Sequence, residues 1–144
     1  MKTEKAEVTW EYYDNGQLAC EEYRVNGEYH NPNGSAYKYW YKNGQLAYEQ
    51  YYINGELHNP NGSATKSWYK NGQLRYESYR VNGTIHNPNA PAYREWNDNG
   101  QLESEQYWIN GNNLTKEEFD NRNKSDCNGK IVEIDGKKYQ LKEI

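Results

Sequence analysis

The sequence has few aliphatic residues and only two cysteines. Leu, Ile, Val and Phe together account for 18 of the 144 residues, a share that by itself is typical of disordered chains. Cys20 and Cys127 lie in unrelated contexts, and two cysteines cannot supply a disulfide framework or a paired-cysteine zinc site. We therefore expect both thiols to be reduced and unpaired.

Long apolar runs and blocks of basic residues are also missing. No segment approaches the roughly 18 apolar residues of a membrane span, and the N-terminal lysines are not followed by the apolar stretch of a secretion signal. We expect no membrane span and a cytoplasmic location. The net charge is −4, with 17 basic and 21 acidic residues interspersed. Nucleic-acid binding is therefore disfavoured, except through an acidic surface that imitates DNA.

The residue patterns of common catalytic and cofactor sites are absent from the sequence. We find no glycine-rich phosphate loop, nucleophile elbow or calcium loop, and no nucleophile accompanies the repeated glutamates. The sequence therefore predicts a protein that is not an enzyme, with no catalytic residue, metal or cofactor.

Aromatic residues take the place of the missing aliphatic ones. The chain has 16 Tyr and five Trp residues, each with a large apolar body and a polar tip. Such side chains can cover both faces of a thin sheet while their polar groups stay in water.

A 28-residue repeat organises the chain. Asn-Gly-Gln-Leu begins at Asn15, Asn43, Asn71 and Asn99, and a second Asn-Gly begins at Asn26, Asn54, Asn82 and Asn110. Asn-Gly between strand-like segments predicts a type I′ hairpin turn, because both residues tolerate positive φ. Two reversals per repeat predict an all-β fold, a single-layer twisted antiparallel meander of four β-hairpin repeats.

The repeat defines the expected domain boundaries. Residues 1–7 form an N-terminal lead, and the repeats span 8–35, 36–63, 64–91 and 92–113. Residues 114–144 are expected to form a cap. Thr115 and Glu118 make a capping box for a short helix that reaches about Arg122. Asp135-Gly136 predicts a further hairpin, which we expect to pair with the last strand and cover its edge. Uncovered sheet edges would allow self-association.

A His-Asn-Pro-Asn segment follows the second turn of the first three repeats and begins at His30, His58 and His86. Proline cannot donate to a ladder, so this segment should bulge out at one rim of the sheet. The histidines would stand about 10 Å apart, too far to share a metal ion. We interpret them as loop anchors.

Alternation along the strands assigns the side chains to two faces. One face barely changes between repeats, and it pairs a glutamate with a basic residue across the strands, as in Glu49 and Lys38. The other face differs from repeat to repeat. Tyr, Trp and Arg are enriched in interface hot spots, so this variable face is the candidate partner-binding surface. Its candidate residues are Tyr37, Tyr39, Tyr48, Tyr52, Tyr76, Arg80, Tyr93 and Trp108.

The repeat resembles the MORN repeat. Tyr48-Glu49, Tyr51, Ile53-Asn54-Gly55 and His58 are similar to the tyrosine-glutamate, aromatic, asparagine-glycine and histidine-glycine positions of that family. The resemblance covers residues 8–113 and is greatest to the variant repeats of bacterial and phage proteins, some of which are antitoxins. The period here is longer, and histidine-asparagine replaces histidine-glycine. The resemblance implies an extended hairpin sheet that binds proteins and sometimes associates with membranes.

These observations lead to a noncatalytic protein-binding scaffold as the expected function. The partner could be a toxin or a host defence enzyme, which an antitoxin-like or phage anti-defence inhibitor would mask. The alternative is capture of a small ligand, a nucleotide or a sugar, on an aromatic sheet face. Single-strand nucleic-acid sites of that kind also carry positive charge, which this surface lacks.

Overall fold

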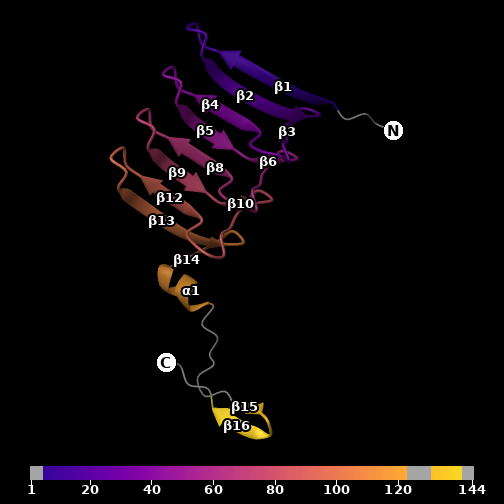
Figure 1. Ribbon diagram of the computed structural model, residues 1–144, viewed down its shortest axis with the longest axis vertical. Coiled ribbons are helices and arrows are strands. Elements are labelled where there is room, and N and C mark those ends of the chain that lie inside the picture. Colours follow the sequence, from indigo (N-terminus) through magenta and orange to yellow (C-terminus); the bar gives the residue numbers. More distant parts are fainter. Residues whose placement is uncertain (1–4, 123–130, 141–144) are drawn as a thin grey trace. The chain divides into compact units, whose positions relative to one another are not determined.

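The computed structural model describes residues 5–122 and 131–140. Its internal contacts divide the chain into two compact units, Met1–Asn113 and Leu114–Ile144. The repeats form the first unit (Figure 1).

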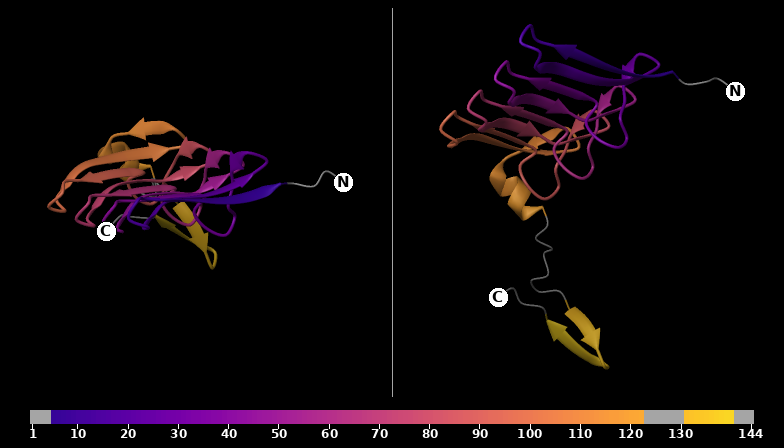
Figure 2. Two further views of the ribbon diagram at one scale, coloured as in Figure 1. Left: turned by 90° about the horizontal axis from the view of Figure 1, so that it is seen from above. Right: turned by 45° about the horizontal axis from the view of Figure 1, so that its top comes forward.

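The first unit is built on a long antiparallel sheet with two main strands per repeat. Its order is β1-β2-β4-β5-β8-β9-β12-β13-β14, with β3 also paired to β2, which confirms the predicted meander. The strands lie side by side, with the first turns at one end of the strands and the second turns at the other end (Figures 1 and 2). The main strands are β1 (Ala6–Tyr12), β2 (Leu18–Val25), β4 (Tyr37–Trp40), β5 (Leu46–Gln50), β8 (Thr65–Trp68), β9 (Leu74–Ser78), β12 (Tyr93–Trp96) and β13 (Leu102–Ile109).

The second turns are the predicted type I′ hairpins. Asn54 has φ 50° and Gly55 has φ 76°, and the other three repeats have the same pair of left-handed residues. The turns join short strands that continue or follow the main ones. These are β3 (Glu28–Tyr29), β6 (Tyr52–Ile53), β7 (Glu56–Leu57), β10 (Arg80–Val81), β11 (Thr84–Ile85) and β14 (Asn112–Leu114).

The first turns are not type I′, so the prediction was wrong there. Only the glycine has positive φ, as at Gly44, and its N–H donates to the Tyr41 carbonyl at 2.8 Å. This pattern is a type I turn followed by a left-handed glycine, with a bulge between Tyr39 and Trp40. The Asn43 side chain accepts the N–H of Gln45 and so favours this three-residue loop.

The face that barely changes between repeats carries a ladder of alternating charge, which confirms the predicted pairing of glutamates with basic residues. In register across the strands stand Glu21, Lys38, Glu49, Lys66, Glu77, Arg94 and Glu105. Lys38 lies 3.8 Å from the Glu21 carboxylate, and Arg94 lies 3.0 Å from that of Glu77. Glutamates and cations on neighbouring strands thereby offset each other along the array.

The three histidines join successive repeats. Nδ1 of His30 accepts the backbone N–H of Asn54 at 3.1 Å, and His58 and His86 do the same for Asn82 and Asn110. Each donor belongs to a left-handed turn residue of the next repeat. The interpretation as anchors is confirmed, and the anchored segment is the following repeat's turn.

The Asn-Pro-Asn segments form tight loops at the rim. Asn59 donates from Nδ2 to the Ser63 carbonyl at 2.9 Å, and its Oδ1 accepts the N–H of Asn61 at 3.1 Å. Asn31 and Asn87 hold the other two loops in the same way. The chain then returns to the sheet at a buried alanine, Ala36, Ala64 or Ala92. The small side chain suits this close return.

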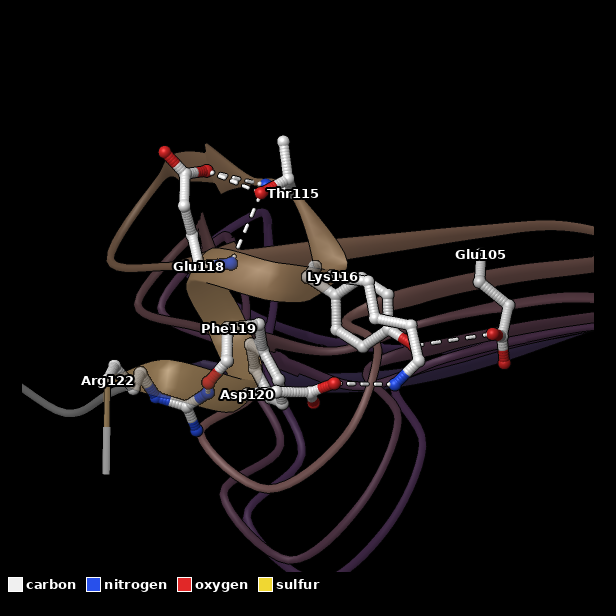
Figure 3. A network of polar contacts seen from close by, with 8 residues as sticks. Glu105, Thr115, Lys116, Glu118, Phe119, Asp120 and Arg122 are labelled. Carbon is white, nitrogen blue, oxygen red and sulfur yellow. Dashed lines mark hydrogen bonds and ion pairs between the residues drawn. The ribbon is translucent and has the colours of Figure 1, made fainter. Parts of the chain in front are cut away.

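The second unit contains a helix and a hairpin, each at its predicted place. Helix α1 (Lys116–Asn121) has the capping box of Thr115 and Glu118, which Figure 3 shows. Strands β15 (Ile131–Ile134) and β16 (Lys137–Gln140) flank Asp135-Gly136, both with positive φ. They form a two-stranded sheet of their own. The prediction that this hairpin pairs with the last strand of the large sheet was therefore wrong. Cys127 lies outside the described residues.

Candidate aromatic binding face

The structure places the candidate residues on the same face of the sheet. Tyr37 lies opposite Gln50, and Tyr39 lies opposite Tyr48. In later repeats Tyr76 lies opposite Ser67, and Tyr93 lies opposite Ser78. Tyr52, Arg80 and Trp108 occupy equivalent positions just before the second turns. We call this surface, with Tyr29, the aromatic face.

Six tyrosine rings of this face form a continuous chain. In order they are Tyr52, Tyr29, Tyr37, Tyr48, Tyr76 and Tyr93, and neighbouring ring centroids lie 5.1–6.3 Å apart. These are the distances of stacked and edge-to-face aromatic pairs. The sequence of this face differs from repeat to repeat, yet its rings pack on one another across repeat boundaries.

Small side chains lie beneath the rings. Thr65, Ser67 and Ser78 are buried, and so is the free thiol of Cys20. The residues that differ between repeats therefore alternate between a large ring and a small group. Across the strands Ser67 lies opposite Tyr48 and Tyr76, Ser78 lies opposite Tyr93, and Cys20 lies opposite Tyr39, so each of these small residues has a ring beside it.

The environment holds the tyrosine hydroxyls in their neutral form. Burial and the hydrogen bond to Glu22 raise the pKa of Tyr29 to about 12. Burial, with the bond that its hydroxyl makes to Tyr48 at 2.7 Å, also raises the pKa of Tyr76. Burial raises the pKa of Tyr37 as well. At neutral pH Tyr29, Tyr37 and Tyr76 therefore present hydroxyl groups.

A pocket of about 310 Å³ opens in the middle of the aromatic face, and we call it the central pocket. Three tyrosines form part of its wall, and apolar side chains of the second hairpins form another part. Arg80 stands at its side, and buried hydroxyls lie in the wall. The lining residues are Tyr48, Gln50, Leu57, Thr65, Tyr76, Ser78, Arg80, Ile85 and Tyr93. Such a pocket can hold a side chain or a small ligand with one polar end.

Four candidate residues do not line this pocket, namely Tyr37, Tyr39, Tyr52 and Trp108. Tyr37 and Tyr52 belong to the chain of rings. The hydroxyls of Tyr39 and Tyr13 are hydrogen-bonded at 2.8 Å, and Tyr39 is 37% exposed. Trp108 donates from its indole nitrogen to Gln106 at 3.1 Å. Both belong to the aromatic face, but neither lines the central pocket.

A second cavity of about 500 Å³ lies at the first turns. Three tyrosines and two lysines line it with Asn43, namely Tyr13, Tyr39, Tyr41, Lys42 and Lys70. Lys42 lies 5.6 Å from the ring centre of Tyr13, and Lys70 lies 5.9 Å from that of Tyr41. The sequence suggested that aromatic positions lack positive charge, whereas here aromatic rings and cations come together.

Three residues of the aromatic face and its central pocket were not predicted from the sequence. Tyr29, Leu57 and Ile85 come from the short strands after the second turns, which we had not assigned to either face. The available signal was their equivalence: they occupy the same position in successive repeats. Thr65 and Ser78 were read as variable surface positions, yet both are buried.

Two further features are absent from the described part of the chain. No group of three or more His, Cys, Asp or Glu residues there could hold a metal ion. Within the same residues, no helix is both long and apolar enough to cross a membrane.

This geometry defines a β-hairpin repeat scaffold. A family model described as MORN repeat variant matches residues 9–26, 36–54, 64–82 and 92–110, which together make up more than half of the chain. The chain therefore belongs to the MORN repeat variant family. No curated protein and no solved structure gave a significant match. MORN repeats are generally noncatalytic scaffolds that often bind membranes or proteins.

Proposed function

We propose that this chain is a noncatalytic scaffold that binds a protein partner through its aromatic face. The continuous chain of six tyrosine rings is the observation that carries the proposal. Tyrosine offers a large, rigid contact area with few rotatable bonds, and Tyr, Trp and Arg dominate interface hot spots. The rings are packed in advance, so little ordering is required when the partner binds.

The differences between repeats support a specific partner. The other face repeats its charge ladder in every repeat, as regular stacking requires. The aromatic face changes its Tyr, Ser, Thr and Arg residues from one repeat to the next. A partner would therefore meet a different set of contacts in each repeat, and this fixes both its position and its orientation.

We further propose that the partner is an enzyme that the scaffold masks, as an antitoxin masks its toxin or a phage protein masks a host defence enzyme. A broad, noncatalytic face suits such inhibition because it covers an active site by occupying area. This finer proposal rests on the resemblance to antitoxin-like variant repeats.

Affinity capture from the source cells, using the full chain, tests the proposal. Wild type should retain a protein in a fixed ratio, and the double variant Tyr39→Ser, Trp108→Ser should lose it. Trp10→Ser is the matched control, since Trp10 is 52% exposed and lies opposite Glu21 on the other face. Equal retention by all three proteins, or no stoichiometric protein at all, contradicts the proposal. An enzyme partner whose activity is unchanged in the complex contradicts only the inhibitor role.

The cavity at the first turns favours a second candidate, capture of a nucleotide or sugar. Its three tyrosines offer stacking surfaces, and Lys42 and Lys70 supply the positive charge that a nucleotide phosphate requires. A thermal-shift screen of nucleotides and sugars should then give a hit that Lys42→Gln and Lys70→Gln weaken. A screen without any hit removes this candidate.

A further inference from the structure

Two arginines occupy equivalent positions of repeats one and three, Arg24 and Arg80. Each donates a hydrogen bond from Nη1 to the carbonyl oxygen of the glycine in the turn that follows, Gly27 or Gly83, and both bonds are 2.9 Å long. Both guanidinium groups are therefore held in the same way within their repeats. Their surroundings can be compared directly.

Arg24 is neutralised within its own repeat. Its Nε donates to the Glu22 carboxylate at 3.0 Å, and its guanidinium carbon lies 3.7 Å from the ring centre of Tyr29. The Tyr29 hydroxyl donates to the same carboxylate at 2.7 Å. Carboxylate, ring and guanidinium thus form a closed group that needs no outside anion.

Arg80 has neither a carboxylate nor a tyrosine ring at the equivalent positions of its repeat. Ser78 stands at the position of Glu22, and Ile85 stands at the position of Tyr29. None of the ion pairs among the described residues includes Arg80. Its repeat therefore leaves a positive charge uncompensated at the place where repeat one supplies a carboxylate.

The missing groups are replaced by open space. Arg80, Ser78 and Ile85 all line the central pocket, together with Leu57 and the ring of Tyr76. Replacing glutamate and tyrosine by smaller side chains creates room next to the guanidinium. The pocket thus combines an unpaired cation with apolar and aromatic walls.

A second cation adds to the positive field of this region. Arg75 is exposed, and its charge acts on Tyr76 and Tyr93, where it opposes the rise of their pKa values. Glu95 accepts the hydroxyl of Tyr93 at 3.1 Å. An anion in the pocket would therefore meet Arg80 and neutral hydroxyls in the wall, with Arg75 outside the lining.

We propose that the central pocket binds a carboxylate carried on an apolar body, with Arg80 as its counter-ion. The carboxylate takes the place of the Glu22 side chain of repeat one, and the apolar body lies against Leu57, Ile85 and the tyrosine rings. In the complex the carboxylate belongs to an acidic side chain of the protein partner. That last assignment rests on the proposed function, whereas the pocket's preference for a carboxylate does not.

Titration of the full chain with benzoate, followed by NMR, tests the pocket without the partner. Benzamide, which has the same shape without the charge, and inorganic phosphate, which lacks the apolar body, are the comparison probes. Benzoate should bind at least about tenfold more tightly than either, and the shifts should map to the pocket. Equal binding of benzamide or of phosphate overturns the proposal.

Four variants make the test specific. Arg80→Gln should weaken benzoate binding about tenfold or more, and Arg80→Lys should retain part of it. Ser78→Glu restores the carboxylate of repeat one, so it should abolish binding while the chain stays folded. Arg24→Gln is the matched control and should bind as wild type. Unchanged binding in Arg80→Gln or Ser78→Glu, or an equal loss in Arg24→Gln, contradicts the site.

Capture of the protein partner by the Ser78→Glu variant tests the assignment of the carboxylate to that partner. If the partner's carboxylate occupies the pocket, Ser78→Glu should also prevent capture of the partner. Benzoate binding with capture unaffected by Ser78→Glu overturns the partner assignment and leaves a site for small carboxylates. Capture of a partner without any benzoate binding overturns the pocket and leaves the scaffold function standing.

Discussion

The phenol of Tyr41 donates a hydrogen bond to the backbone carbonyl of Trp68, 2.8 Å away in the next repeat. Tyr13 makes the same bond to Trp40, and Tyr69 makes it to Trp96. The acceptor is the residue at which the ladder shifts register, as between Ser67 and Trp68. The fourth repeat has Asn97 at the position of these tyrosines. The phenol therefore couples each repeat to the one that follows.

Removing a single phenol should weaken this coupling. Tyr41→Phe keeps the ring and deletes the donor, so we expect the free energy of unfolding to fall by about 0.5–1.5 kcal/mol. Urea denaturation measures it. Tyr12→Phe is the control, because Tyr12 is 64% exposed and should be nearly neutral. Equal effects of the two substitutions would falsify the coupling role.

The charge ladder should matter most where it is buried. Glu77 is 7% exposed, and its carboxylate lies 3.0 Å from Arg94. Glu77→Gln should therefore cost about 1.5–3 kcal/mol of stability, the usual range for a hydrogen bond to a charged group. Glu105 faces the same arginine from the other side but is exposed, so Glu105→Gln should change stability by less than about 0.5 kcal/mol. A larger loss at Glu105 contradicts this ranking.

Alkaline pH should destabilise the array through Tyr29. The folded pKa of this phenol is raised to about 12, against about 10 in the unfolded chain, so the folded state keeps the proton longer. The contribution to stability is complete below pH 10 and is lost as the pH rises from about 10 through 12. Unfolding free energies measured between pH 9 and 11.5 should fall, and Tyr29→Phe should make the decline shallower. A decline of the same slope in the variant would argue against Tyr29 as a source.

Substitution of a packed ring on the aromatic face should cost more stability than substitution of its arginine. Tyr76 packs between Tyr48 and Tyr93, so Tyr76→Ala should cost about 2–4 kcal/mol, somewhat below the loss of a fully buried aromatic. Arg80 bonds only its own turn with its side chain, and Arg80→Gln should cost less than about 1 kcal/mol. Thermal unfolding of both variants checks this. We therefore expect the melting temperature to stay nearly unchanged in the Arg80 variant and to fall in the Tyr76 variant.

Local chemistry made much of the fold predictable from the sequence. Asn54-Gly55 can form a type I′ turn with its own residues, and Thr115 with Glu118 can cap a helix start. Because the period is 28 residues throughout, each turn that is predicted in one repeat is predicted in all four. The pairing of Glu49 with Lys38 and the anchoring role of His58 followed from the same regularity.

What could not be predicted depends on contacts between repeats. Asn43-Gly44 has the same letters as Asn54-Gly55, but its side chain bonds Gln45 and the Lys70 carbonyl of the next repeat, and this selects another turn. Ser78 looks like a free surface position until the second hairpin places Ile85 beside it. The pocket arises because Ser78 and Ile85 are smaller than Glu22 and Tyr29, their equivalents in repeat one. A local sequence pattern does not reveal the space that such a difference leaves.

The partner's dissociation constant for face-specific variants tests the central claim most directly. With the captured partner purified, isothermal titration should show that Tyr39→Ser with Trp108→Ser weakens binding at least tenfold, while Trp10→Ser on the charge-ladder face leaves the constant unchanged. Unfolding measured in parallel should show all three proteins folded. The opposite ranking, with binding lost in Trp10→Ser and kept in the double variant, would contradict the assignment of the aromatic face as the binding surface.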